Sequence, residues 1–429
     1  MAQSEDIWSD LGFVRNPYDY KPLKVNEDDR SIFVGRSNEE RQFKLEVSGR
    51  QGGIVMVEGR VGVGKTSFVN MMQYDKWKGT AGESKRSGKM MPCFETIELK
   101  ENIETTDFML SVLSNFMYSL ERIHGTRRVE ANQKLFAGKE LIANTLKSGY
   151  GFSISILGSG FGASKQTMRN PPSVTVLSTV NHVMNECFEA ASKQFGYEAF
   201  IIPVNNLDAI SDESVTAFLN SARDTLLSIG QVWWILTARL GFFSYLETHA
   251  RRVSEMVTGT PVRLEPLSLE EVHNAVEKRM VKFAIPHVKT VSIVPQEIVD
   301  YLHKVSNGEI RYAFKRLSDL VYQFRLGFPS ERQIPARVGL EILRSIAQNR
   351  VNELNLTERE RKILQRSAEI GTFRVRDFAL FGVSSLQNFQ RDITKFSKMG
   401  LLNREEKNKR EVAYSSTGDV NLAFKSITL

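Results

Sequence analysis

The segment Gly59–Thr66, Gly-Arg-Val-Gly-Val-Gly-Lys-Thr, constrains the fold of this chain more than any other. The apolar run Ile54–Val57 precedes it and the helix-compatible stretch Ser67–Met72 follows it, so a buried strand leads into a helix. Glycines there let backbone N–H groups surround a phosphate at the positive end of the helix. The lysine can reach the β- and γ-phosphates, and the threonine hydroxyl can bind Mg²⁺. We predict a nucleoside triphosphate site formed by Gly59, Arg60, Val61, Gly62, Val63, Gly64, Lys65, Thr66 and Ser67.

Composition limits the class of protein. With 429 residues, 41% apolar and 25% charged, the chain is predicted to be globular with two or three domains, which excludes collagen-like, coiled-coil and disordered chains. Cys93 and Cys187 are too few for a disulfide framework or a four-ligand zinc site, and they fit a reducing cytoplasm. The acidic stretch Met1–Asp6 has no apolar core, so we expect no signal peptide, and no apolar stretch is long enough for a membrane span.

A second motif lies upstream of the phosphate-binding segment. Phe33–Arg36, followed by Glu39 and Glu40, resembles the segment that precedes the P-loop in AAA+ and STAND-type ATPases, in particular the archaeal-type origin-recognition ATPases. The resemblance implies ATP with Mg²⁺ as the ligand, and contact with adenine through the backbone around Val34, Gly35 and Arg36.

The same resemblance covers most of the chain and implies its architecture. Val262–Val272 is similar to the last core strand and the start of a helical lid, and Ser268 with Glu271 forms a capping box that begins a helix there. The implied fold is an α/β P-loop NTPase core with a parallel, AAA+-like sheet, a helical lid and a C-terminal winged helix-turn-helix. The predicted boundaries are 1–50 for an N-terminal segment, 51–264 for the core with an insertion at about 124–172, 265–350 for the lid and 351–429 for the winged helix.

The strand expected to complete the ATP site departs from the family pattern. The run Ala199–Val204 predicts a buried strand, and in the resembling families it ends in Asp, often followed by Glu. Here those positions are Asn205 and Asn206, and Asp208 matches a later acidic residue. A neutral amide cannot act as a general base and binds Mg²⁺ less well than a carboxylate. We predict ATP binding with weak hydrolysis and with Thr66 and Asp208 at the metal; the alternative is a different strand register in which another acid serves.

Three further motifs imply charges near the phosphates. Val232–Arg239 resembles a sensor 1 strand, which implies Thr237 or Arg239 beside the γ-phosphate, unless Arg239 only caps the strand end. The motif Asn-Gly-Glu-Ile-Arg that ends at Arg311 resembles sensor 2, which implies a lid arginine on the phosphates, or else an exposed arginine at a helix start. Arg252 falls where AAA+ proteins often place an arginine finger, although a solvated helix end fits equally well.

The insertion is longer than such a core requires. Phe152–Ala163 alternates apolar and polar residues before a run of glycines, which predicts a β-hairpin. We expect the insertion to pack on the core or to contact a neighbouring molecule, with nucleic-acid contact as an alternative. The basic residues that flank the hairpin are Arg127, Arg128, Lys134, Lys139 and Lys147.

The C-terminal region resembles a winged helix-turn-helix. Thr357 and Glu360 form a capping box, and the later helix that begins after Ser385 has apolar residues at helical spacing. Residues 356–429 hold 14 Lys and Arg against 9 Asp and Glu, which is most of the +7 net charge. Basic and amide side chains suit phosphates and base edges, so we predict double-stranded DNA as partner, with protein binding as the alternative. The predicted DNA-binding residues are Ser385, Gln387, Asn388, Arg391, Lys395, Lys407, Lys409 and Arg410.

These motifs together predict an ATP-binding protein that binds DNA and couples its nucleotide state to homo-oligomerisation or to recruitment of a protein partner. The alternative is a regulatory switch that does not hydrolyse ATP and whose winged helix binds protein. ATP turnover with and without DNA separates the two.

Overall fold

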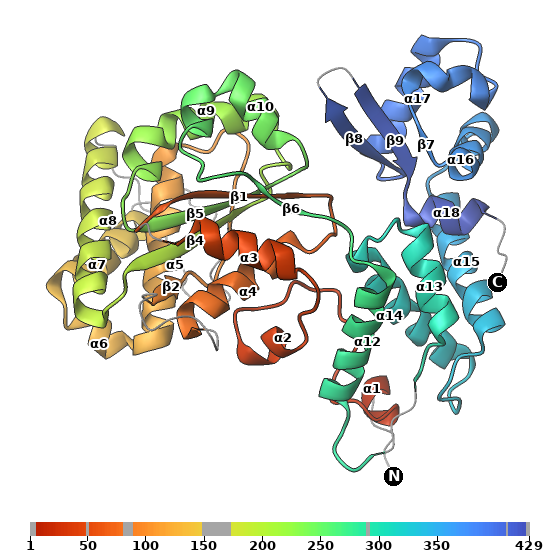
Figure 1. Ribbon diagram of the computed structural model, residues 1–429, viewed down its shortest axis with the longest axis horizontal. Helices are drawn as coiled ribbons and strands as arrows, with labels where there is room; N and C mark the ends of the chain where they lie inside the picture. The colour runs from red at the N-terminus through yellow and green to blue at the C-terminus, as the bar shows by residue number, and fades with distance from the viewer. Residues whose placement is uncertain are drawn as a thin grey trace.

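The computed structural model describes residues 6–48, 51–79, 89–147, 173–288, 292–408 and 411–425 (Figure 1). An α/β core, a helical lid and a C-terminal domain with a small sheet follow one another along the chain. The predicted hairpin Phe152–Ala163 and the wing residues Lys409 and Arg410 lie outside the described residues. Every helix in the described part of the chain is too short or too polar to span a bilayer.

A parallel sheet forms the centre of the core. Its spatial order is β2 (Met90–Pro92), β4 (Ala199–Asn205), β5 (Val232–Ala238), β1 (Gly53–Gly59) and β6 (Val262–Leu264), and β3 (Ile97–Glu98) also pairs with β4. All of these pairings are parallel. The phosphate-binding segment therefore follows a central strand that lies between β5 and β6. This position is the one expected for an AAA+-type P-loop core.

Alternate residues of the strands pack into two separate apolar clusters, because both faces of the sheet are covered by helices. On β1, Ile54 and Met56 belong to one cluster and Val55 and Val57 to the other. The first face carries α5 (Thr105–His124), α8 (Ser173–Phe195), α9 (Asp212–Ala222) and α10 (Phe242–His249). The second carries α3 (Ser37–Glu46) and α4 (Lys65–Lys78).

The segment Cys93–Leu99 alternates apolar and polar residues, a pattern that predicts one strand, but the structure interrupts it. Side chains of α5 take over the backbone hydrogen bonds there, since Ser119 Oγ accepts from Phe94 N at 3.0 Å and Asn115 Oδ1 from Glu95 N at 3.3 Å. Within this segment only β3 forms a strand, and β2 ends just before it.

The described part of the insertion packs on the core helices. It contains α6 (Thr126–Glu130) and α7 (Gln133–Lys147). Lys134 Nζ lies 2.5 Å from the Glu186 carboxylate on α8, and Lys139 Nζ lies 2.5 Å from both Glu121 and Glu130. These lysines are paired with acids of neighbouring helices.

The lid consists of α12 (Leu269–Phe283), α13 (Gln296–Val305), α14 (Ile310–Gly327) and α15 (Ala336–Glu353). The Ser268–Glu271 capping box forms at the start of α12 as predicted. The short helices α1 (Ile7–Asp10) and α2 (Glu27–Ser31) precede the core, and α1 lies against the lid, where Trp8 Nε1 donates to the Tyr322 hydroxyl at 3.0 Å.

The C-terminal domain has the order of elements expected of a winged helix. These are α16 (Glu358–Ile370), β7 (Thr372–Phe373), a 3₁₀ helix (Val375–Phe381), α17 (Leu386–Lys398), β8 (Leu402–Asn408) and β9 (Glu411–Ser416). The antiparallel strand order is β7-β9-β8. Phe389, Ile393 and Phe396 are buried as their spacing predicted, but Leu386 is 44% exposed, because it begins α17 beyond the packed face. A last helix, α18 (Gly418–Phe424), returns to the lid beside α15 (Figure 1).

Candidate nucleotide site

The loop between β1 and α4 has the backbone conformation of a phosphate-binding loop. Gly62 and Gly64 adopt φ angles of 76° and 103°, in the left-handed region that favours glycine. The loop ends where α4 begins at Lys65, so the free N–H groups of the first turn and the positive end of the helix meet at the loop. This arrangement binds an anion without any further side chain.

Lys65 occupies the place that a phosphate-binding lysine requires. Its Nζ donates to the Gly59 carbonyl at 2.8 Å and to the Arg60 carbonyl at 3.3 Å, and it lies 3.5 Å from Asp208 Oδ2. Burial lowers the pKa of Lys65, and the Asp208 carboxylate opposes that shift. The structure therefore brings together two predicted site residues, Lys65 and Asp208.

Three predicted polar residues meet at the end of β4. Asn205, which is 5% exposed, donates from Nδ2 to Thr66 Oγ1 at 3.0 Å, and its Oδ1 accepts from the Thr237 hydroxyl at 2.9 Å. Asn205 is the last residue of β4 and lies beside Thr66 of the phosphate loop. A neutral amide thus occupies the position where a carboxylate would face the metal-binding hydroxyl.

Asn206 contacts the neighbouring strand β3. Its φ of 59° is left-handed, a conformation that asparagine tolerates, and its Nδ2 donates to Glu98 Oε1 at 3.0 Å. Glu98 ends β3, where its Cα is the register partner of Asn205. Glu98 was not among the predicted site residues, although an acidic residue near the end of an alternating segment was a signal for it.

The residues present fit Mg²⁺ only in company with a nucleotide. No group of three His, Cys, Asp or Glu side chains among the described residues could hold a metal ion by itself. Mg²⁺ often needs only one or two protein ligands besides phosphates and waters, and Thr66 and Asp208 are suitable oxygen donors. When bound, Mg²⁺ would neutralise charge on the phosphate oxygens.

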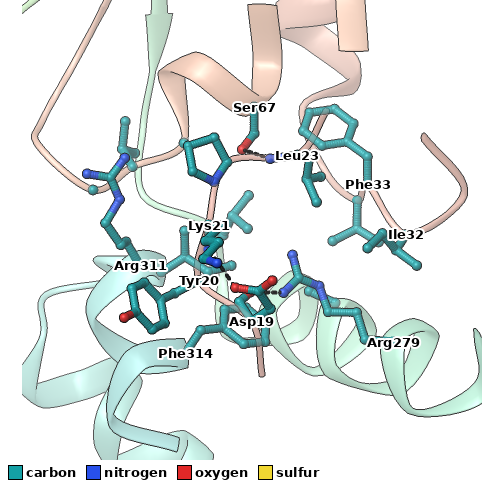
Figure 2. A pocket seen from close by; sticks show the side chains of 18 of the residues that line it. Asp19, Tyr20, Lys21, Leu23, Ile32, Phe33, Ser67, Arg279, Arg311 and Phe314 are labelled. Carbon is teal, nitrogen blue, oxygen red and sulfur yellow. Dashed lines mark hydrogen bonds between the residues drawn. The ribbon is translucent and has the colours of Figure 1, made fainter. Parts of the chain in front are cut away.

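A pocket opens beside the phosphate loop, between the N-terminal segment and the lid (Figure 2). Its walls combine apolar side chains with a few charged groups, which suits a nucleotide base. Val34 and Arg36, two of the residues predicted to lie near adenine, line it. A Cβ on Gly35, whose φ is 69°, would collide with Glu271 of the lid. Other lining residues are Asp19, Tyr20, Lys21, Pro22, Leu23, Ile32, Phe33, Arg279, Arg311 and Phe314.

Two predicted nucleotide-binding residues also hold the pocket together. Arg36 donates from Nη2 to the Val63 carbonyl at 3.0 Å, so its guanidinium anchors the phosphate loop. Ser67 Oγ accepts from Leu23 N at 3.0 Å, which ties the N-terminal segment to α4 (Figure 2).

Arg279 is a buried cation on the lid side of this pocket. It donates from Nη1 to the Asp19 carbonyl at 2.6 Å and lies 4.4 Å from the ring centroid of Phe314 (Figure 2). Its Nε has no hydrogen-bond partner among the described residues. Burial lowers the pKa of Arg279 to about 10.

The lid touches the phosphate loop at the start of α14. Arg311 N donates to the Gly62 carbonyl at 3.3 Å, and a Cβ on Gly62 would collide with the Glu309 side chain. Burial raises the pKa of Glu309 to about 7, although the Arg311 guanidinium opposes the shift. The predicted lid arginine, Arg311, is thus placed at the edge of the site.

Two other predicted residues lie apart from this group. Arg239 Nη2 pairs with Asp212 Oδ2 of α9 at 2.6 Å. Arg252 is exposed on α11 (Arg251–Ser254), at the surface of the core.

The predicted DNA-binding residues of α17 divide into two groups. Gln387, Asn388 and Arg391 are exposed. Ser385 instead caps the helix by accepting from Asn388 N, and Lys395 Nζ pairs with Glu360 Oε1 at 2.6 Å. Lys407 lies on β8.

Comparisons with known proteins give similarity at the level of structure. No family model matches the chain, and no curated protein matches its sequence. The Aeropyrum pernix ORC2 protein in ADPNP–ADP complexes is similar over 95% of this chain and 96% of that chain, with 12% identity and a TM-score of 0.48. The Aeropyrum pernix ORC1 protein in complex with DNA is similar over 95% of this chain and 96% of that chain, with 12% identity and a TM-score of 0.46. A variant of Thermotoga maritima RuvB is similar over 93% of this chain and 95% of that chain, with 13% identity and a TM-score of 0.43.

The assignment of the fold rests on this chain's own strand order, loop conformation and lid. The chain has the P-loop NTPase fold of AAA+ type.

Proposed function

We propose that this chain binds ATP with Mg²⁺ and uses its nucleotide state to control a C-terminal DNA-binding domain, and through it the assembly of the protein or the recruitment of a partner. The observation that carries this proposal is helix α14, which touches the phosphate loop at one end and the C-terminal domain farther along.

The first contact of α14 is the one made by Glu309 and the Arg311 backbone with Gly62. A triphosphate bound by the loop would bring negative charge next to Glu309 and within reach of Arg311. Nucleotide binding therefore changes the electrostatic balance at the contact that sets the lid's position.

The second contact is a buried ionic group around Asp419 of α18, which is 5% exposed. Asp419 Oδ1 accepts from the Tyr312 hydroxyl at 2.7 Å and from Arg316 Nη2 at 2.6 Å, and Oδ2 accepts from Arg350 Nη1 at 2.5 Å. Tyr312 and Arg316 belong to α14 and Arg350 to α15, so a movement of the lid would carry α18 with it.

Hydrolysis by this site is slow in our proposal, because Asn205 and Asn206 supply no carboxylate at the end of β4. A wild-type turnover below about 1 per second, raised by Asn205→Asp, is the expected result. Turnover in the usual range of ATPases, with no gain in Asn205→Asp, would contradict a disabled strand end.

DNA binding is supported by the exposed polar face of α17 and by the basic excess of residues 356–429. We expect the affinity of the full chain for duplex DNA to fall steeply between about 50 and 200 mM salt, as phosphate contacts require.

Arg391→Ala should weaken DNA binding by about 1–3 kcal/mol if the Arg391 guanidinium contacts a base. The matched control is Arg337→Ala, an exposed arginine of the lid. Light scattering after size exclusion, in ATP and in ADP, tests assembly in the same samples.

One observation favours protein binding by the C-terminal domain as a second candidate. Leu380 and Leu386 are 57% and 44% exposed next to the first turn of α17, where a helix that reads DNA would contact bases. DNA binding that is absent, or that does not change with salt, would favour this second function.

A further inference from the structure

The end of β4 offers two amides, which leaves open which group accepts the proton of an attacking water. Among the described residues, four acids that follow or end β3 and β4 are Glu98, Glu101, Asp208 and Asp212. Three are engaged by cations or hydroxyls: Asp208 lies 3.5 Å from Lys65 Nζ, Asp212 pairs with Arg239 at 2.6 Å, and Glu101 accepts from the Ser214 hydroxyl at 2.6 Å. The fourth is Glu98.

Glu98 differs from these three in its surroundings. Its side chain is exposed, and Oε1 accepts one hydrogen bond of 3.0 Å from the Asn206 amide. An ionised carboxylate accepts at both oxygens, so the amide orients Glu98 and leaves Oε2 able to accept from a water.

The position of Glu98 connects it to the phosphate site. Parallel strands carry their ligand-binding groups at their carboxyl ends, and β3 and β4 end side by side. Asn205, the register partner of Glu98, bonds to Thr66 of the phosphate loop, and the next residue, Asn206, bonds to Glu98. The left-handed φ of Asn206 directs its side chain toward β3, so carboxylate and amide form one unit at the site.

We propose that Glu98 on β3, held by Asn206 directly after β4, is the carboxylate that orients and deprotonates the attacking water. This inference rests on the proposed ATP site. A water oxygen attacks the γ-phosphorus, and its proton passes to Glu98. The bond from the γ-phosphorus to the β–γ bridging oxygen breaks, and its electron pair leaves with ADP. Glu98 then returns the proton to solvent, so that ATP and water give ADP, inorganic phosphate and a proton.

The test is single-turnover ATP hydrolysis with protein in excess, together with ATP affinity measured in parallel. Glu98→Gln keeps the shape of the side chain but cannot accept the proton, so the rate should fall about 100-fold or more, with ATP affinity unchanged within about twofold. The matched control is Glu101→Gln. The Glu101 carboxylate accepts hydrogen bonds from Ser211 and Ser214 at the start of α9, so its removal should leave the wild-type rate of hydrolysis.

A reciprocal variant separates catalysis from structure. Glu98→Asn combined with Asn206→Glu exchanges the carboxylate and the amide between the two positions. This double variant should hydrolyse ATP at least about tenfold faster than Glu98→Gln. If Glu98→Gln does not fold, Asn206→Ala carries the test, and a fall of about tenfold is expected because the carboxylate loses its orientation.

A wild-type rate in Glu98→Gln overturns the inference, and so does a wild-type protein that binds ATP but shows no hydrolysis. Loss of ATP binding in the wild type would instead refute the proposed function, and the affinity measurement distinguishes the two failures.

Discussion

The contact of α14 with the phosphate loop and its contact with the C-terminal domain are built differently. At the phosphate loop the contact includes one long backbone hydrogen bond, Arg311 N to Gly62 O at 3.3 Å, and a partly buried carboxyl group, Glu309, whose pKa burial raises to about 7. At the C-terminal domain, Asp419 binds three side chains at 2.5–2.7 Å. A weak contact that depends on charge can open and close, whereas a buried ionic group resists separation. The lid and α18 should therefore move together against the core.

The strong contact can be broken at Asp419, and this is the largest effect we expect. Asp419→Ala removes the buried partner of Arg316, whose side chain is 3% exposed, and leaves this arginine only the more exposed Asp319. Removal of one partner of such a pair destabilises a protein by about 3–5 kcal/mol. Urea unfolding followed by circular dichroism should show this loss.

The control for Asp419→Ala is Asp319→Ala, which removes a more exposed partner of the same arginine, 2.6 Å from Nη1. Asp319→Ala should lower the free energy of unfolding much less than Asp419→Ala does. Equal stability of the two variants would contradict the contrast between the two contacts of α14.

The weak contact can be tested through Arg311. If its guanidinium reaches the γ-phosphate, Arg311→Ala should reduce the preference for ATP over ADP by about 2 kcal/mol, or roughly 30-fold, the contribution of a hydrogen bond between charged groups. Calorimetric titration with both nucleotides measures this preference. Lys315→Ala, one turn along the same helix, is the matched control, and an identical preference in Arg311→Ala would remove Arg311 from the phosphate site.

The smallest expected effect is a pH dependence of lid closure. The pKa of Glu309 is about 7 with the lid closed, against an ordinary value of 4.5 in water. Between these values the closed lid holds more protons than the open lid, so closure is favoured at low pH and weakens as pH rises through 7. From pH 6 to pH 8 the closure equilibrium should fall by at most about tenfold.

Distances between spin labels on the core and the lid would report the closure equilibrium. In Glu309→Gln the lid should stay closed at both pH 6 and pH 8, because an amide has no charge to bury. A pH dependence that persists in this variant would assign the effect to another group.

Much of the fold was predictable from local sequence. The phosphate loop, the continuous apolar strands β1, β4 and β5, and the capping boxes at Ser268 and Thr357 all form as predicted. Each depends on residues that are neighbours in the chain, so the signal for it lies within one short segment.

Other features needed the folded chain. Side chains of α5 interrupt the predicted strand between β2 and β3, and Glu360 pairs with the predicted DNA-binding residue Lys395. Neither contact can be predicted from the local sequence pattern, because the two partners of each contact lie at least 20 residues apart along the chain.

The sequence by itself determined that this chain has a phosphate-binding loop and that β4 ends at Asn205 with Asn206 next to it, because loop conformation and strand burial follow from the residues of each segment. Only the tertiary structure decided that Glu98 meets Asn206 and that Asp419 joins α18 to the lid. The Glu98 contact depends on which strands become neighbours in the sheet, and the Asp419 contact on how the last helix packs against the lid. Both join residues more than 100 positions apart in the sequence.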